Sequence, residues 1–168
     1  ARRQRQMCIR DSYRLCQIFG MLNVYLDGYD VHCLRSFGNR DMIRGVWYGG
    51  YHNDRDEATE RFLPWYSLLM GFNSAWWYDA GKPGENYNAL APDYTEIQSF
   101  KWTSEEIREI KRGIGKLVTS IPRDNDPIAI LSSQRNFHAD SLGAKEGLGG
   151  GADHHHHSMS NFIQLVLD

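Results

Sequence analysis

The chain has 168 residues, enough for one domain or parts of two. Hydrophobic residues make up 41% of it and can form a core, and the formal net charge of −2 gives no electrostatic basis for a nucleic-acid partner. No apolar run approaches the roughly 20 residues that a membrane-spanning helix needs, so we expect no membrane contact. The three cysteines, Cys8, Cys16 and Cys33, form no CxxC motif, and this odd, sparse number argues against a disulfide framework.

Both ends of the sequence have unusual features. Residues 1–12, ARRQRQMCIRDS, are basic and lack the apolar segment of a signal peptide. The letters MCIRDS resemble an adapter-derived translation found in environmental sequence collections, so we expect residues 1–12 to be a non-native leader. The sequence stops at Asp168 inside an apolar helical pattern without a stop signal. We therefore expect a fragment of a longer protein.

The first half of the sequence alternates between predicted strands and helices. YDVHCLRSFG (29–38) is predicted as a short strand leading into a loop, and MIRGVWYGGY (42–51) as a second strand that ends in glycines. Residues 57–70 have apolar side chains at the spacing of one helical face, and FNSAWWYDA (72–80) is predicted as the next strand. Strand, helix and strand at this spacing form a βαβ unit, which implies a parallel sheet covered by helices.

The second half begins with a long irregular segment, residues 81–102, which we expect to be ordered because it contains several large apolar side chains. Residues 103–121 are predicted as one helix, with Thr103 and Glu106 as a capping box and Pro122 as its stop. DPIAILSS (126–133) is predicted as a buried strand, and SMSNFIQLVLD (158–168) as the start of a helix. We therefore expect a domain boundary near residue 122.

Four stretches have a family resemblance: RFLPWYSLLMGFNSAWWYDAGKPGEN, EEIREIKRGIGKLV, DPIAILSSQRNFHA and SMSNFIQLVLD. Their order resembles the end of the catalytic barrel of β-galactosidase-like glycoside hydrolases, family 42 and its relatives, over roughly residues 25–168. The resemblance implies an α/β fold in which residues 13–121 are the C-terminal part of a (β/α)8 barrel with the helix that follows it. Residues 122–168 would be the truncated start of a flavodoxin-like trimerisation domain. It also implies a homo-oligomer for the full-length protein.

The resemblance implies a carbohydrate substrate and no cofactor. Barrel enzymes place their sites at the carboxyl ends of strands, and VWYGGY and AWWYDAGKPGEN would be two such ends. The candidate substrate-binding residues are Trp47, Tyr48, Trp77, Tyr78 and Glu85. Aromatic rings offer flat apolar surface to a sugar, and the Glu85 carboxylate would accept hydrogen bonds from its hydroxyls.

Strand alternation distinguishes the three neighbouring aromatic residues. Trp76 and Tyr78 are expected on one face of their strand and Trp77 on the other. We favour Trp77 and Tyr78 for the site because they lie nearest the carboxyl end of the strand. The alternatives are that these aromatics only pack the core and that Glu85 is a solvated loop residue.

The carboxylates of glycoside hydrolysis are missing from the expected positions. The reaction normally needs two of them, and the resemblance places the acid/base upstream of this sequence and the nucleophile at the end of RGVWYGGY, which contains no glutamate. The nearest acids, Asp54, Asp56 and Glu57, are predicted to be helix-start residues. No catalytic residue is therefore assigned.

Three functions stay open at this point: a piece of a glycoside hydrolase, a noncatalytic carbohydrate-binding or assembly module, and a flavodoxin-like nucleotide-binding domain that uses residues 132–136. No metal site is expected, because His154 to His157 have no acidic or cysteine partners at ligand spacing.

Overall fold

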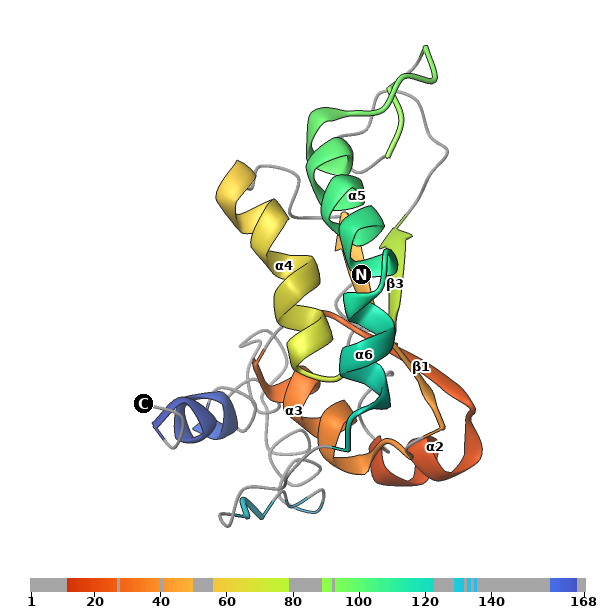
Figure 1. Cartoon of the computed structure of the whole chain (residues 1–168). Coiled ribbons are helices and arrows are strands. Elements are labelled where there is room, and N and C mark those ends of the chain that lie inside the picture. The colour runs from red at the N-terminus through yellow and green to blue at the C-terminus, as the bar shows by residue number, and fades with distance from the viewer. Residues whose placement is uncertain are drawn as a thin grey trace.

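The computed structural model of the chain describes residues 12–26, 28–39, 41–49, 56–78, 89–91, 93–122, 129–131, 133, 135 and 158–165. Figure 1 shows the arrangement of its helices and strands. Their order is α2 (Ser12–Ile18), β1 (Met21–Val24), α3 (Gly28–Phe37), β2 (Ile43–Gly49), α4 (Glu57–Leu69), β3 (Ser74–Tyr78), α5 (Gln98–Lys111) and α6 (Ile114–Ser120). Residues 158–165 form a further helix.

The three described strands form one parallel sheet in the order β1-β2-β3. In the register of this sheet, Gly45 of β2 pairs with Asn23 of β1 and with Ser74 of β3. Helix α3 connects the first two strands and α4 connects the second two, so the predicted α/β class and the βαβ unit over residues 42–80 are confirmed.

One face of the sheet packs against helices. Val24, Val46 and Tyr48 point to this face and share one buried cluster with residues of α3. Leu63 and Met70, from α4 and its end, pack against the same cluster. Because side chains alternate along a strand, the residues between them, such as Asn23 and Trp47, point to the opposite face. We call this opposite side the open face, since α3 and α4 both lie on the other side.

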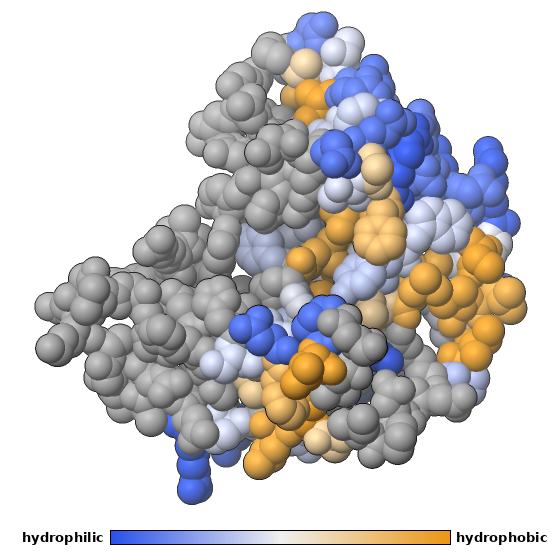
Figure 2. Space-filling view, turned by 90° about the vertical axis from the view of Figure 1, so that its left-hand side faces the viewer, coloured by the Kyte–Doolittle hydropathy of each residue, from blue (hydrophilic) through white to orange (hydrophobic). Residues whose placement is uncertain are grey.

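Helices α4 and α5 lie side by side along the sheet (Figure 1). Helix α4 follows the capping residue Asp56 and extends from Glu57 to Leu69, close to the predicted residues 57–70, with Pro64 inside it. Some apolar residues of these helical layers stay in contact with solvent, and Figure 2 shows apolar surface beside hydrophilic surface on one side of the molecule. The exposed apolar residues include Phe62, Leu69 and Leu117.

Two sequence-based predictions of regular structure are wrong. Residues 29–38 form helix α3, where a strand was predicted. The apolar residues at 29, 31 and 33 fit strand alternation, but Tyr29 and Cys33 also have the i, i+4 spacing of one helical face, and both are buried in one cluster with Ile163. The strand that precedes α3 is β1, whose four residues gave no clear pattern.

The predicted single helix over residues 103–121 is two helices. Helix α5 begins at Gln98, five residues before the predicted capping box, so Thr103 lies inside the helix. Gly113, at φ 160° and ψ −40°, interrupts the helical backbone before α6 starts. The break was missed because the apolar stripe continues across Gly113. Helix α6 ends at Ser120, and Pro122 follows it as predicted.

The predicted second domain is described only in part. Residues 129–131 and 133 belong to no helix or strand, whereas a strand was predicted over 126–133. The helix predicted from residue 158 is confirmed over 158–165. Residues 1–11 of the predicted leader lie outside the described residues, and the boundary near residue 122 stays a prediction.

Candidate functional site

Two tryptophans lie next to each other on the open face. Trp47 of β2 pairs with Trp76 of β3 in the register of the sheet. Their ring centroids are 6.4 Å apart, and the ring planes are tilted by 57°. Trp76 is 38% exposed and Trp47 is partly buried, so the pair presents aromatic surface on the side of the sheet opposite α3 and α4.

The backbone of Gly45 brings two polar atoms together beside this pair. A Cβ at Gly45 would overlap the side-chain oxygen of Asn23, and it would lie 2.8 Å from the indole nitrogen of Trp76. Asn23 Oδ1 and Trp76 Nε1 therefore converge over Gly45 from the two neighbouring strands. The glycine is required here because any larger residue would occupy the space that these two side chains use.

These two atoms have complementary hydrogen-bonding roles. Asn23 Oδ1 is an acceptor, and it is buried without a hydrogen-bond partner among the described residues. Trp76 Nε1 can only donate. Because Asn23 Oδ1 is buried while Trp76 is 38% exposed, the indole N–H is the group of this pair that we consider as a donor to a ligand oxygen. Flat aromatic surface next to an indole donor suits a ligand that has both an apolar face and oxygen atoms.

Tyr48 and Trp77, two of the sequence-predicted site residues, lie on the helix side of the sheet. The Tyr48 side chain is 2% exposed, and its hydroxyl is 2.9 Å from Ser67 Oγ. Trp77 packs edge-on against Phe100 of α5, with ring centroids 4.9 Å apart. Both therefore make the contacts of core residues, which was the alternative considered for these aromatics.

The remaining predicted site residues are Trp47, Tyr78 and Glu85. Trp47 lies on the open face, as described above, and Tyr78 pairs with Gly49 at the end of β3. The side chain of Tyr78 and the whole of Glu85 lie outside the described residues. Trp76 and Trp77 lie on opposite faces, as the alternation predicted. Trp76 was not among the predicted site residues, because the prediction used position along the strand and the sequence does not show on which face the helices pack.

The acidic residues near β2 have structural roles. Asp56 Oδ1 accepts a hydrogen bond of 2.7 Å from the backbone nitrogen of Thr59, and this bond holds the pKa of Asp56 below its ordinary value. Glu57 forms a 2.7 Å ion pair with Arg61 one turn further along α4. The prediction that these two are helix-start residues is confirmed, and Asp54 lies outside the described residues. Strands β1, β2 and β3 contain no carboxylate.

A network of ion pairs and hydrogen bonds joins α4 to α5. Arg61 of α4 forms 2.8 Å ion pairs with Glu105 and Glu106 of α5. Trp65 Nε1 donates to the second oxygen of Glu106 at 2.8 Å. The sequence spacing predicted a capping box, but Glu106 instead binds Arg61 and Trp65 of α4. These bonds hold α5 in place, and with it Phe100, which packs against Trp77.

The thiols of the described residues could have a structural role or bind a metal. Cys16 and Cys33 are both buried, and burial raises the pKa of the Cys16 thiol, as expected for structural residues. Within the described residues, no group of three or more His, Cys, Asp or Glu side chains could hold a metal ion. His154 to His157 lie outside that part of the chain. None of the described helices is both long and apolar enough to cross a membrane.

Comparisons with protein-family models, with curated proteins and with solved structures gave no match to this chain.

Proposed function

We propose that this chain forms part of the wall of a (β/α)8 barrel of the β-galactosidase-like glycoside hydrolase type, and that it binds carbohydrate on the open face. The observation that carries the proposal is the Trp47–Trp76 pair on the face of the sheet opposite α3 and α4. In a (β/α)8 barrel the helices form the outer ring, so the opposite face of the sheet lines the barrel interior.

The strand order is the one that a (β/α)8 barrel requires. Strands β1, β2 and β3 are neighbours in sequence order, and all pairs are parallel. Residues of α3 and α4 pack on the same buried cluster, which places both connections on one face of the sheet. One half of a doubly wound sheet has the same arrangement, because its strand order reverses and its helices change face only at the switch point. Successive helices on one face are typical of the barrel.

The chemistry of the open face supports a sugar ligand. A sugar ring has an apolar face of C–H groups that suits the aromatic surface of Trp76, and hydroxyl oxygens that suit the Trp76 Nε1 donor. Because the described strands contain no carboxylate, the role we propose for them is binding, and the two groups needed for cleavage of a glycosidic bond would come from elsewhere in the protein.

Saturation-transfer NMR with lactose and the full chain tests this proposal. We expect transfer from the protein to the sugar ring protons, and we expect Trp76→Ala to weaken lactose binding about tenfold, which corresponds to about 1.4 kcal/mol. Phe62→Ala is the matched control, because Phe62 is an exposed aromatic residue on α4. Equal transfer in the wild-type chain and in folded Trp76→Ala would contradict the proposal, as would no transfer to the wild-type chain.

A further inference from the structure

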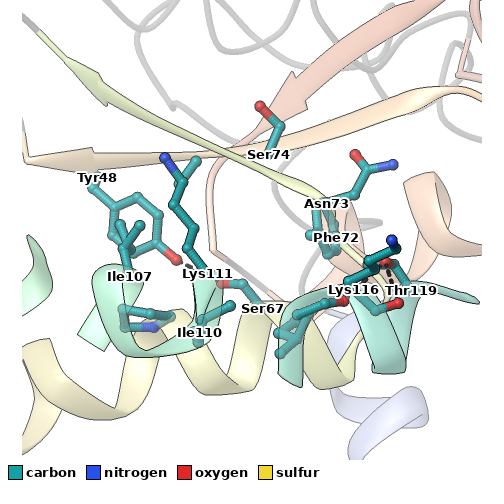
Figure 3. Close-up of a pocket in the computed structure, with 14 residues that line it drawn as sticks. Tyr48, Ser67, Phe72, Asn73, Ser74, Ile107, Ile110, Lys111, Lys116 and Thr119 are labelled. Carbon is teal, nitrogen blue, oxygen red and sulfur yellow. Dashed lines mark hydrogen bonds between the residues drawn. The ribbon is translucent and has the colours of Figure 1, made fainter. Parts of the chain in front are cut away.

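A hollow of about 610 Å³ lies on the helix side of the sheet, between β3 and the helices α4, α5 and α6 (Figure 3). Its volume is in the range of pockets that bind small organic molecules, about 300–1,000 Å³. Because Tyr48 and helix residues line it, the hollow is separate from the open face, where Trp47 and Trp76 lie.

One part of the lining is apolar. Leu68 and Phe72 lie at the end of α4, and Ile107 and Ile110 face them from α5. Helix α6, which closes another side, contributes Gly115, Lys116 and Thr119 to the lining and buries none of its residues. Apolar surface that helix packing has not covered is therefore available to the hydrocarbon part of a ligand.

The charged side chains that line the hollow are both positive. Among the described residues that line the hollow, Lys111 and Lys116 are the charged ones, and none is a carboxylate. Within the described part of the chain neither lysine forms an ion pair, whereas Arg108 and Arg112 pair with glutamates. Figure 3 shows Lys111 extending from α5 toward the sheet and Lys116 beside Asn73 and Thr119. The unpaired lysines give this hollow a positive potential.

We propose that the hollow is a binding site for an amphiphilic anion, a carboxylate with an unbranched aliphatic chain. The chain would pack between the apolar residues of α4 and α5, and the carboxylate would lie near Lys111 or Lys116. The lysines select the charge of the head group, and the uncovered apolar surface selects the hydrocarbon.

Isothermal titration of the full chain with decanoate tests this site. We expect saturable binding at a ratio of one to one. Decyltrimethylammonium has the same hydrocarbon chain with the opposite charge, and it should bind at least tenfold more weakly. Acetate has the head group alone and should not bind in the same concentration range. Equal affinity for decanoate and decyltrimethylammonium would overturn the proposal, and so would the absence of decanoate binding.

Substitutions locate the site. The double variant Lys111→Gln, Lys116→Gln should weaken decanoate binding at least tenfold, whereas Lys101→Gln, an exposed lysine of α5 outside the hollow, should leave it unchanged. Ala75→Leu should also weaken binding, because Ala75 lines the hollow and a larger side chain would fill it. Unchanged binding in either the double variant or Ala75→Leu would show that decanoate binds elsewhere.

The site is independent of the proposed sugar-binding face. Trp76→Ala should therefore leave decanoate affinity unchanged, and the lysine double variant should leave lactose binding unchanged. A decanoate affinity that falls in Trp76→Ala would place the anion on the open face and overturn the assignment to this hollow.

Discussion

Glu60 of α4 and Thr103 of α5 are joined by a hydrogen bond of 2.8 Å, in which the threonine hydroxyl donates to the carboxylate. Glu60 is 2% exposed and Thr103 is 1% exposed, so the bond lies inside the interface between the two helices. A buried carboxylate is costly unless its oxygens have partners. The pair therefore fixes the register of α5 on α4, and through α5 the position of Phe100 against Trp77.

Thr103→Val removes this bond while it keeps the shape of the side chain. We expect the free energy of unfolding to fall by about 1–3 kcal/mol, because a buried oxygen of Glu60 loses a donor. Urea unfolding followed by circular dichroism measures the change, with the midpoint falling and the slope unchanged. Thr103→Ser keeps the hydroxyl and is the matched control. A loss in Thr103→Val no larger than that in Thr103→Ser would show that the hydrogen bond contributes little.

The sequence predicted correctly those helices and strands whose local sequence pattern matches the contacts that they make in the fold. Helix α4 has a capping residue, Asp56, and an apolar face, and both signals hold in the structure. Strands β2 and β3 are continuous runs rich in large aromatic and branched residues, which suit a strand. These three elements form the βαβ unit on which the site depends.

The wrong predictions concern residues whose structure depends on contacts with residues far away in the sequence. Thr103 and Glu106 have the spacing of a capping box, but their side chains bind Glu60, Arg61 and Trp65 of α4, more than forty residues away. Residues 29–38 fit both periods, and in the structure the helix buries Val31 and Leu34 in the main core and Tyr29 and Cys33 against Ile163. No local signal reports such contacts.

The sequence indicated the residue types of the candidate site, but it did not indicate on which face of the sheet the site lies. The sequence indicated aromatic residues at the ends of neighbouring strands, and alternation separated Trp76 from Trp77. The sequence alone does not tell which face the helices cover. The role of Asn23 was also hidden, because it depends on the pairing of β1, an unpredicted strand, with Gly45.

Glu106 is expected to make the stability of the chain depend on pH. Its pKa lies below the ordinary value of 4.5, because Trp65 and then Arg61 hydrogen-bond to its charged form. A carboxyl group with a lowered pKa in the folded state stabilises the fold above its unfolded pKa, and this contribution disappears as the pH falls through the folded value. The free energy of unfolding should therefore decrease as the pH falls below about 4.5.

Urea unfolding at several pH values measures this dependence. Glu106→Gln should be less stable than the wild-type chain near pH 7, and the difference should shrink as the pH falls below 4.5. Glu109 is an exposed residue of the same helix, and Glu109→Gln is the control. It should leave the dependence of the free energy of unfolding on pH unchanged. Parallel curves for the wild-type chain and Glu106→Gln would contradict the assigned role.

Gly45→Ala tests the close approach of Asn23 and Trp76. The new Cβ would overlap Asn23 Oδ1 and lie 2.7 Å from Trp76 Cδ1, so both side chains must move. We expect a loss of about 1–3 kcal/mol in the free energy of unfolding, as is typical of overpacking. Gly28→Ala is the matched control, since nothing lies within 4 Å of a Cβ there. Urea unfolding compares the two.

A second substitution distinguishes overpacking from a general intolerance of the strand. Asn23→Ala in the Gly45→Ala background removes the atom that the new Cβ overlaps. The double variant should therefore regain part of the lost stability, as a coupling between neighbouring sites. Additive losses at the two positions would mean that the two side chains do not compete for the same space.

The last prediction separates the two neighbouring tryptophans. Trp77 packs in the core against Phe100, so Trp77→Ala should lower the free energy of unfolding by about 3 kcal/mol, near the low end for a buried aromatic residue. Trp76 is 38% exposed on the open face, so Trp76→Ala should cost less stability and mainly affect sugar binding. Urea unfolding and saturation transfer from each variant to lactose measure both effects. A larger loss of stability in Trp76→Ala than in Trp77→Ala would show that the open face, and not the helix side, contains the main core of this sheet.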